Sequence, residues 1–159
     1  MARTFFLGAA FVLATFGGAS AQEWQTYTSK QFGLQIAYPG DLVDYSRSRP
    51  ARGEFALRNG GRLVLTRNDL GGQRLSDFLK GTLLKDVDVT YSRQKNNWMA
   101  YSGYVGDQIV YGRSHLSCGG RTAHSFLIRY PVRERAVYDR IAERLSHSLR
   151  VEPAAPGAC

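Results

Sequence analysis

The sequence lacks the short motifs that mark the commonest enzyme classes. It contains no G-x-S-x-G, no H-E-x-x-H, no Walker phosphate-binding sequence and no C-x-x-C-H haem-attachment sequence. It has only two cysteines in 159 residues, which is too few for a small scaffold held together by disulfides. No apolar run reaches the ~20 residues that a membrane-spanning helix needs. We therefore expect a protein that is not an enzyme, binds no cofactor and has no transmembrane segment.

Apolar and aromatic side chains, in contrast, are plentiful enough to build one hydrophobic core. Hydrophobic residues make up 43% of the sequence and aromatic residues 12%, which excludes a disordered chain. A length of 159 residues fits a single domain. The boundaries that we expect are a signal peptide over residues 1–21, one globular domain over residues 22–150 and a tail over residues 151–159.

The N-terminal residues have the pattern of a secretory signal peptide. Arg3 gives a short positive region, residues 5–16 are apolar, and Ala19-Ser20-Ala21 forms a small-residue cleavage site. The alternative is a buried N-terminal helix, but the A-x-A ending favours a signal peptide. We therefore expect an exported protein, periplasmic or extracellular.

The two cysteines, Cys118 and Cys159, both lie after the expected cleavage site. Because an exported chain meets an oxidising compartment, we expect a Cys118–Cys159 disulfide that ties the tail to the domain. The alternative is a reactive or intermolecular thiol, but neither cysteine lies in a C-x-x-C motif or beside an obvious activating base.

The chain is basic, and its arginines cluster. Lys and Arg number 21 against 13 Asp and Glu, which gives a formal net charge of +8, and arginine is densest over residues 47–74. Outside the cytoplasm, acidic proteins and envelope polyanions are more available than nucleic acid, so we expect one of these partners and no nucleic acid. The alternative is a basic surface that only favours solubility. The partner-binding surface that we expect comprises Arg47, Arg49, Arg52 and Arg58.

The first half of the expected domain has the pattern of β-strands. Residues 32–38 alternate apolar with polar or small side chains, which predicts a half-buried strand, and residues 24–28 fit a short edge strand. Residues 54–57 and 62–66 flank Asn59-Gly60-Gly61, which is a strong turn signal and predicts a β-hairpin.

Residues 86–130 have the pattern of a four-stranded antiparallel meander. Three turn signals, Asn96-Asn97, Gly106-Asp107 and Gly119-Gly120, divide this segment into four runs of strand-forming residues. If each turn is a two-residue loop, every register puts the apolar residues on the same face. The pairs that we expect are Val89 with Tyr104, Tyr104 with Ile109, Tyr111 with Ser102, and His115 with His124. The expected apolar face consists of Val87, Val89, Tyr91, Trp98, Ala100, Ser102, Tyr104, Ile109, Tyr111, Phe126, Ile128 and Tyr130.

Two segments have the period of an amphipathic helix. Residues 74–85 place four apolar side chains at helical spacing, and residues 133–149 carry an i, i+4 stripe that we expect to cover the apolar face of the meander. The stripe consists of Val137, Ile141, Leu145 and Leu149. The fold class that we expect is therefore α+β, in which a hairpin and a four-stranded antiparallel meander pack with two α-helices.

The opening of the expected domain resembles the start of PsbP-like domains, where an aromatic-Gly-Phe/Leu strand ends in a proline. The matching residues are Trp24, Tyr27, Ser29, Phe32, Gly33, Leu34, Ile36, Tyr38 and Pro39. The order that follows, a hairpin, a helix, a long meander and a closing helix, is similar as well. The resemblance implies a PsbP-like sandwich and a non-enzymatic accessory or binding role. No site residue of the family maps onto this chain.

His115 and His124 are the candidate metal ligands. As directly paired residues they would have Cβ atoms ~4.5–5.5 Å apart, so their imidazoles could share Zn²⁺ or Cu²⁺. A third ligand is missing, however, and Arg113 on the same face disfavours a cation. The alternative is that both histidines make ordinary hydrogen bonds, and we expect no metal.

The aromatic residues of the meander are candidates for a ligand pocket between sheet and helix, with core packing as the alternative. They are Tyr91, Trp98, Tyr101, Tyr104, Tyr111 and Tyr130. Tyr101 falls on the opposite face among small residues, on a surface that can accept the helix of residues 75–83 or a partner.

These features favour an exported, non-enzymatic accessory or protein-interaction module. The alternative function is a periplasmic protein that binds a small ligand or a metal through His115 and His124. A hydrolase is the third hypothesis.

Overall fold

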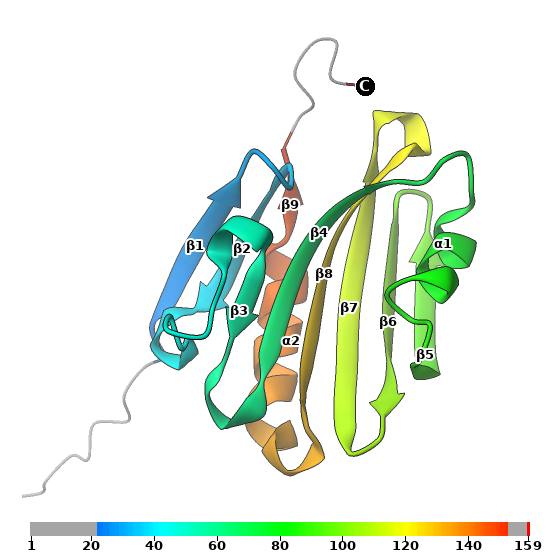
Figure 1. Ribbon diagram of the computed structural model, residues 1–159. Helices are drawn as coiled ribbons and strands as arrows, with labels where there is room; N and C mark the ends of the chain where they lie inside the picture. The colour runs from blue at the N-terminus through cyan, green and yellow to red at the C-terminus, as the bar shows by residue number, and fades with distance from the viewer. Residues whose placement is uncertain (1–21, 153–158) are drawn as a thin grey trace, which may run out of the picture.

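The computed structural model describes residues 22–152 and residue 159, which form two antiparallel sheets and two α-helices (Figure 1). This arrangement confirms the predicted α+β class. The elements are β1 (Trp24–Ser29), β2 (Leu34–Pro39), β3 (Glu54–Ala56), β4 (Arg62–Asp69), α1 (Leu75–Gly81), β5 (Asp88–Lys95), β6 (Trp98–Val105), β7 (Gln108–Ser117), β8 (Thr122–Pro131), α2 (Arg135–Ser148) and β9 (Arg150–Val151).

The strands divide between a small sheet and a large one. The small sheet has the order β1-β2-β9, and the large sheet has the order β3-β4-β8-β7-β6-β5. The hairpin β3–β4 and the meander β5–β8 are therefore parts of one sheet, because β4 pairs with β8. Strand β9 was not expected, because two residues are too few to show a strand pattern in the sequence. It forms where residues 150 and 151 pair with β2.

Most of the predicted meander register is confirmed. Tyr104 pairs with Ile109, Ser102 with Tyr111, and His115 with His124. The turns Asn96-Asn97 and Gly106-Asp107 are two-residue loops, as assumed. The assumed two-residue turn at Gly119-Gly120 is wrong, because residues 118–121 form a four-residue connection, but this connection has the same centre and keeps the predicted register.

The predicted pairing of Val89 with Tyr104 is wrong. A β-bulge between Val89 and Tyr91 shifts the register, so Asp88 pairs with Tyr104 and Val89 pairs with Gly103. Because a one-residue shift turns a side chain to the other face of the sheet, Val89 leaves the predicted apolar face and Asp88 joins it. Val87 also leaves that face and packs with the residues beneath α1.

Helix α2 packs mainly against β2, β7 and β8, and the largest hydrophobic cluster forms between it and these strands. We call the side of the large sheet that it contacts the α2 face. Tyr138 and Ile141 are buried on the inner side of the helix, whereas Val137 is 39% exposed. The predicted stripe is therefore wrong at its first residue, because the buried side chains follow the i, i+3, i+4 series that begins at Tyr138.

Helix α1 covers the opposite face of the large sheet, which we call the α1 face. Leu75 and Leu79 are buried in a cluster with Met99, Tyr101 and Ala123. The small-residue surface around Tyr101 was expected to accept either the helix of residues 75–83 or a partner, and α1 occupies it. Gly112 leaves room for the Tyr101 ring, which a Cβ at position 112 would overlap.

The expected signal peptide, residues 1–21, lies outside the described residues, and so do residues 153–158 of the expected tail. That tail begins within β9, at Val151. Among the described residues, no helix combines the length and apolarity that a membrane crossing requires.

Candidate functional site

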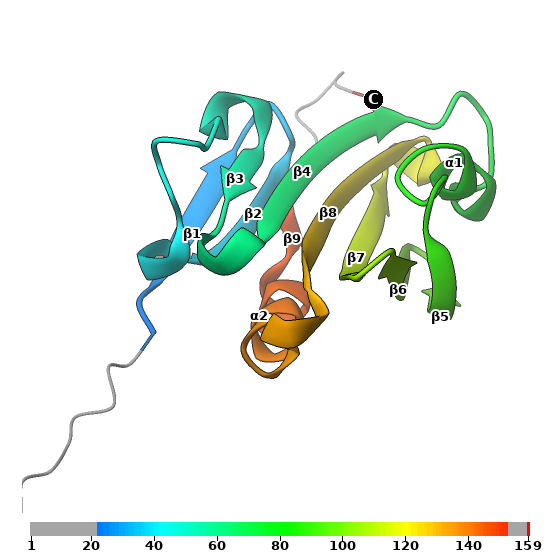
Figure 2. The same ribbon diagram turned by 60° about the horizontal axis from the view of Figure 1, so that its bottom comes forward.

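A groove opens on the α2 face, where the large sheet extends beyond the helix. Figure 2 shows α2 beside β8 and β9, with β5 at the far end of the curved sheet. The groove encloses a cavity of about 430 Å³. Four tyrosines from four strands line its sheet side: Tyr91, Tyr104, Tyr111 and Tyr130. Arg135, Asp139, Glu143, Ser146 and His147 line its helix side.

Hydrogen bonds between the sheet and α2 fix the shape of this groove. The Tyr111 hydroxyl donates to Ser146 Oγ at 3.0 Å, and the Tyr130 hydroxyl donates to Asp139 Oδ1 at 2.7 Å. Asp139 also forms an ion pair with Arg135 at 3.2 Å. Burial and the Asp139 carboxylate raise the pKa of Tyr130, so its hydroxyl stays protonated and acts as a donor rather than a base.

The groove contains four of the six aromatic residues that the sequence suggested. Trp98 does not line it and instead stacks against the Arg113 guanidinium, 4.3 Å from the ring centroid. Tyr101 lies on the α1 face and is fully buried. The helix-side residues were missed, because Asp139 and Glu143 look like ordinary solvent-exposed positions on an amphipathic helix. Only knowledge of how far α2 extends across the sheet would have identified them.

His115 and His124 are paired across β7 and β8 as predicted, but their nitrogens serve different roles. His124 is buried, and its Nδ1 donates to the Phe32 carbonyl oxygen at 2.7 Å while its Nε2 accepts from the Ser117 hydroxyl at 2.8 Å. His115 Nε2 is buried without a hydrogen-bond partner among the described residues. Burial and the nearby Arg113 and Arg150 lower the pKa of His115 to about 4.

This arrangement leaves His124 without a free nitrogen for a metal ion. In residues 22–152 and 159, no group of three or more His, Cys, Asp or Glu side chains could hold one. The alternative of ordinary hydrogen bonds fits His124, which links the β1–β2 turn to β8, but it does not fit His115, whose Nε2 has no partner among the described residues.

The predicted arginines lie around β3, at the other end of the large sheet. Arg47 and Arg49 line a hollow of about 380 Å³ together with Arg62 and Glu54. Arg52 and Arg58 lie in the short 3₁₀ turns on either side of β3, Pro50–Arg52 and Arg58–Gly60. The structure thus brings Arg47 and Arg49 together and places Arg52 and Arg58 on the flanking turns. Arg62 was missed because it belongs to β4 and reaches the hollow only through the hairpin.

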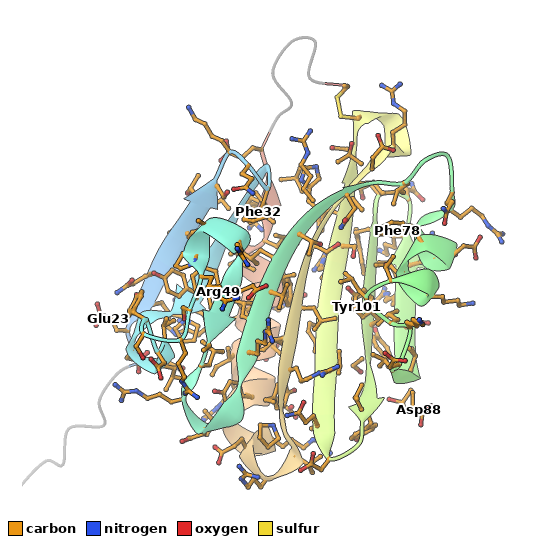
Figure 3. All side chains as sticks on the ribbon, in the orientation of Figure 1. Glu23, Phe32, Arg49, Phe78, Asp88 and Tyr101 are labelled. Carbon is orange, nitrogen blue, oxygen red and sulfur yellow. A yellow bond between two sulfur atoms is a disulfide. The ribbon has the colours of Figure 1, made fainter. Side chains whose placement is uncertain are left out.

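Two of these arginines are paired with carboxylates. Arg47 Nε lies 2.6 Å from Asp44 Oδ2, and Arg62 lies 3.2 Å from Glu54. Hydrogen bonds from Ser46 and Arg47 lower the pKa of Asp44 to about 2. Arg49, Arg52 and Arg58 are exposed and have no ion pair within the described part of the chain. Figure 3 labels Arg49 on this surface.

The predicted disulfide is present. Cys118 and Cys159 are bonded, with their Cα atoms 5.2 Å apart, so the end of the chain is attached beside the β7–β8 turn.

The comparisons with known proteins identify the fold. No family model matches the chain, and no curated protein matches its sequence. The structure is similar to that of cyanobacterial PsbP (CyanoP) from Synechocystis sp. PCC 6803, with a TM-score of 0.55 and 14% identity, over 87% of this chain and 98% of that one. It is also similar to the Saccharomyces cerevisiae Ran-binding protein Mog1p, with a TM-score of 0.57 and 9% identity, over 84% and 97% of the two chains. The chain therefore has the Mog1/PsbP-like fold that its opening residues resemble.

Proposed function

We propose that this chain is an exported, non-enzymatic accessory module that binds an acidic partner through the arginines around β3. The partner presents closely spaced anionic groups, on an acidic protein or on an envelope polyanion. The observation that carries the proposal is the hollow lined by Arg47, Arg49 and Arg62. Arg47 is paired with Asp44 and Arg62 with Glu54, which leaves Arg49 without an ion pair among the described residues. Arg52 and Arg58 extend the positive surface on both sides of the hollow.

The fold and the disulfide support the other parts of the proposal. Mog1p, which has this fold, is named for binding Ran, so the fold serves as a protein-binding module in at least that case. The disulfide supports an oxidising compartment outside the cytoplasm.

Charge reversal tests this proposal. Arg49, Arg52 and Arg58 are replaced together by Glu, and binding is measured to polyglutamate, as a probe for acidic proteins, and to phosphatidylglycerol vesicles, as a probe for the envelope. We expect at least one probe to bind the wild type in a salt-sensitive way. The triple variant should bind that probe more than about tenfold more weakly, which corresponds to about 1.4 kcal/mol.

The matched control reverses three exposed cations elsewhere, Lys80, Arg133 and Arg140, which changes the net charge by the same amount. Binding by this control should stay within about twofold of the wild type. An equal loss in both triple variants would show a net-charge effect and contradict a specific surface. The proposal would also be contradicted if the wild type bound neither polyglutamate nor the vesicles.

A further inference from the structure

We propose a second binding site at the other end of the large sheet, where the free edge of β5 and the tyrosine-lined groove together accept an extended acidic peptide segment. The peptide adds to the sheet as a strand beside β5. Its acidic side chains lie against Arg93 and Lys95, and an apolar or aromatic side chain enters the cavity beside Tyr91. This site does not involve the arginines around β3.

The first observation is that β5 offers an open edge. It is the last strand of the large sheet, it pairs only with β6, and all eight of its residues are exposed. Both ribbon views show β5 at the end of the sheet (Figures 1 and 2). An exposed edge carries main-chain groups that can pair with another strand.

The hairpin geometry identifies which groups these are. Lys95 and Trp98 flank a two-residue turn, so they form a hydrogen-bonded pair, and the pairs alternate from there. The main-chain groups of Arg93 and Tyr91 therefore point to β6. Those of Ser92 and Gln94 point outward, where an added strand would meet them.

The charge of the edge determines the chemistry of the peptide. Arg93 pairs with Ala100 and Lys95 pairs with Trp98, which places both cations on the α2 face with Tyr91. Neither has an ion pair within residues 22–152. A strand beside β5 would place alternate side chains next to them, and carboxylates at those positions complement the charge. Asp88, the carboxylate on the same face, lies at the far end of β5 beyond the bulge.

The cavity gives the peptide a second anchor. Tyr91 lies on the edge strand and also lines the cavity, so a side chain next to Tyr91 is directed into it. The tyrosine rings favour an apolar or aromatic side chain there. Asp139 and Glu143 line the helix wall, so the acidic residues belong along β5 rather than over α2.

The same charges argue against a second copy of the chain as the occupant. Pairing two β5 edges would collect two copies of Arg93 and two of Lys95 on one face of the joined sheet. Charged side chains on an edge strand are a common device against edge-to-edge pairing of identical chains. An acidic peptide removes the repulsion, and a second β5 increases it.

The test uses a synthetic peptide of about seven residues, with threonine at alternate positions and Phe, Glu and Glu at the others. Binding to the ¹⁵N-labelled protein is followed by NMR. We expect the amides of Ser92 and Gln94 to shift and to become protected from hydrogen exchange. Two further peptides are N-methylated at alternate residues, one at the odd positions and one at the even positions, and both keep their charge. The peptide whose methyl groups replace the N–H groups that face β5 loses the strand hydrogen bonds and should not bind.

Two substitutions at the same position separate strand addition from side-chain contacts. Ser92→Pro removes the outward N–H and leaves the β5–β6 hydrogen bonds intact, whereas Ser92→Ala keeps it. We expect Ser92→Pro to weaken binding at least about tenfold and Ser92→Ala to bind like the wild type. Arg93→Glu should also weaken binding, while Lys80→Glu on α1 should not.

Two results would overturn the proposal. One is the absence of binding. The other is a response at Tyr104 and Tyr111 without protection of Ser92 and Gln94, which would show that the groove takes a compact ligand instead. The triple variant of Arg49, Arg52 and Arg58 should bind this peptide normally, so failure here is distinguishable from failure of the proposed function.

Discussion

At the residue scale, the paired histidines show how one sequence feature supports two different local roles. His124 is satisfied on both nitrogens and joins segments 92 residues apart, through its hydrogen bond to Phe32. His115, its cross-strand neighbour, is partly buried beside cations and keeps a nitrogen without a partner among the described residues. The cross-strand pairing is visible in the sequence because turn positions set it. The hydrogen-bond partners are not, because the contact with Phe32 depends on how the two sheets pack.

These histidines predict a loss of stability in mild acid. The pKa of His115 is about 4 in the folded protein against an ordinary value of 6.5, and burial also lowers the pKa of His124. Between these values the unfolded chain binds more protons than the folded one. The free energy of unfolding is therefore fully retained above about pH 6.5 and decreases as the pH falls toward 4. The slope is shallower than the about 1.4 kcal/mol per pH unit of a fully buried group, since His115 is only partly buried.

Urea unfolding between pH 4 and 8 measures this effect. His115→Gln, which cannot be protonated, should flatten the slope, and His147→Gln on the exposed side of α2 should leave it unchanged. Asp44, with its pKa near 2, adds its own loss only below its ordinary value of 3.8, so the two windows are separate. Identical pH profiles for the two glutamine variants would contradict the assignment to His115.

At the element scale, α2 is held by hydroxyl groups as well as by its apolar side. Tyr138 stacks on Tyr130, with ring centroids 5.0 Å apart, and its hydroxyl donates to the Arg58 carbonyl oxygen in the turn between β3 and β4. Burial raises the pKa of Tyr138 to about 12, which keeps this donor protonated. Gly61 makes the contact possible, because a Cβ there would overlap the Tyr138 ring and hydroxyl.

Tyr138→Phe tests this anchor, since it keeps the stacked ring and removes only the hydroxyl. We expect the free energy of unfolding to fall by about 1 kcal/mol, the net value of a typical hydrogen bond. Chemical denaturation measures the difference. Tyr91→Phe is the control, because Tyr91 is 49% exposed and should change stability by less than about 0.5 kcal/mol. Equal effects in both variants would show that the hydroxyl of Tyr138 contributes nothing specific.

The elements themselves were largely predictable from the sequence, and their assembly was not. The meander followed from turn residues and alternation, which are local signals, and so did α2 within about two residues at its start. The bulge at Thr90 could not be predicted, because it depends on the fit between β5 and Gly103, where the Asp88 backbone leaves no room for a side chain. The division into two sheets depends on long-range packing around α2. The groove follows from that packing, and only its tyrosines were visible beforehand.

At the scale of the whole molecule, the disulfide connects the chain end to the turn between β7 and β8. Cys118 and Cys159 are separated by 41 residues, and the segment between them contains β8, α2 and β9. The bond therefore closes a loop that passes through both sheets. It joins the small sheet, through β9, to the end of the large sheet that lies farthest from the β3–β4 turn (Figure 1).

Removing this bond should destabilise the whole fold without changing its binding surfaces. In the chain-entropy model a loop of this length is worth up to about 4 kcal/mol, and release of the chain end in the folded state reduces that value. We expect the double variant Cys118→Ser, Cys159→Ser to unfold at lower urea concentration and with a somewhat larger m-value, because the unfolded chain without the cross-link is less compact. The wild type under reducing conditions should match it, while the double variant should not respond to reductant. Because Arg49 and Ser92 lie in other elements, binding by the folded variant to the acidic probes should equal that of the wild type. A loss of binding that exceeds the unfolded fraction would show instead that the disulfide shapes a binding site.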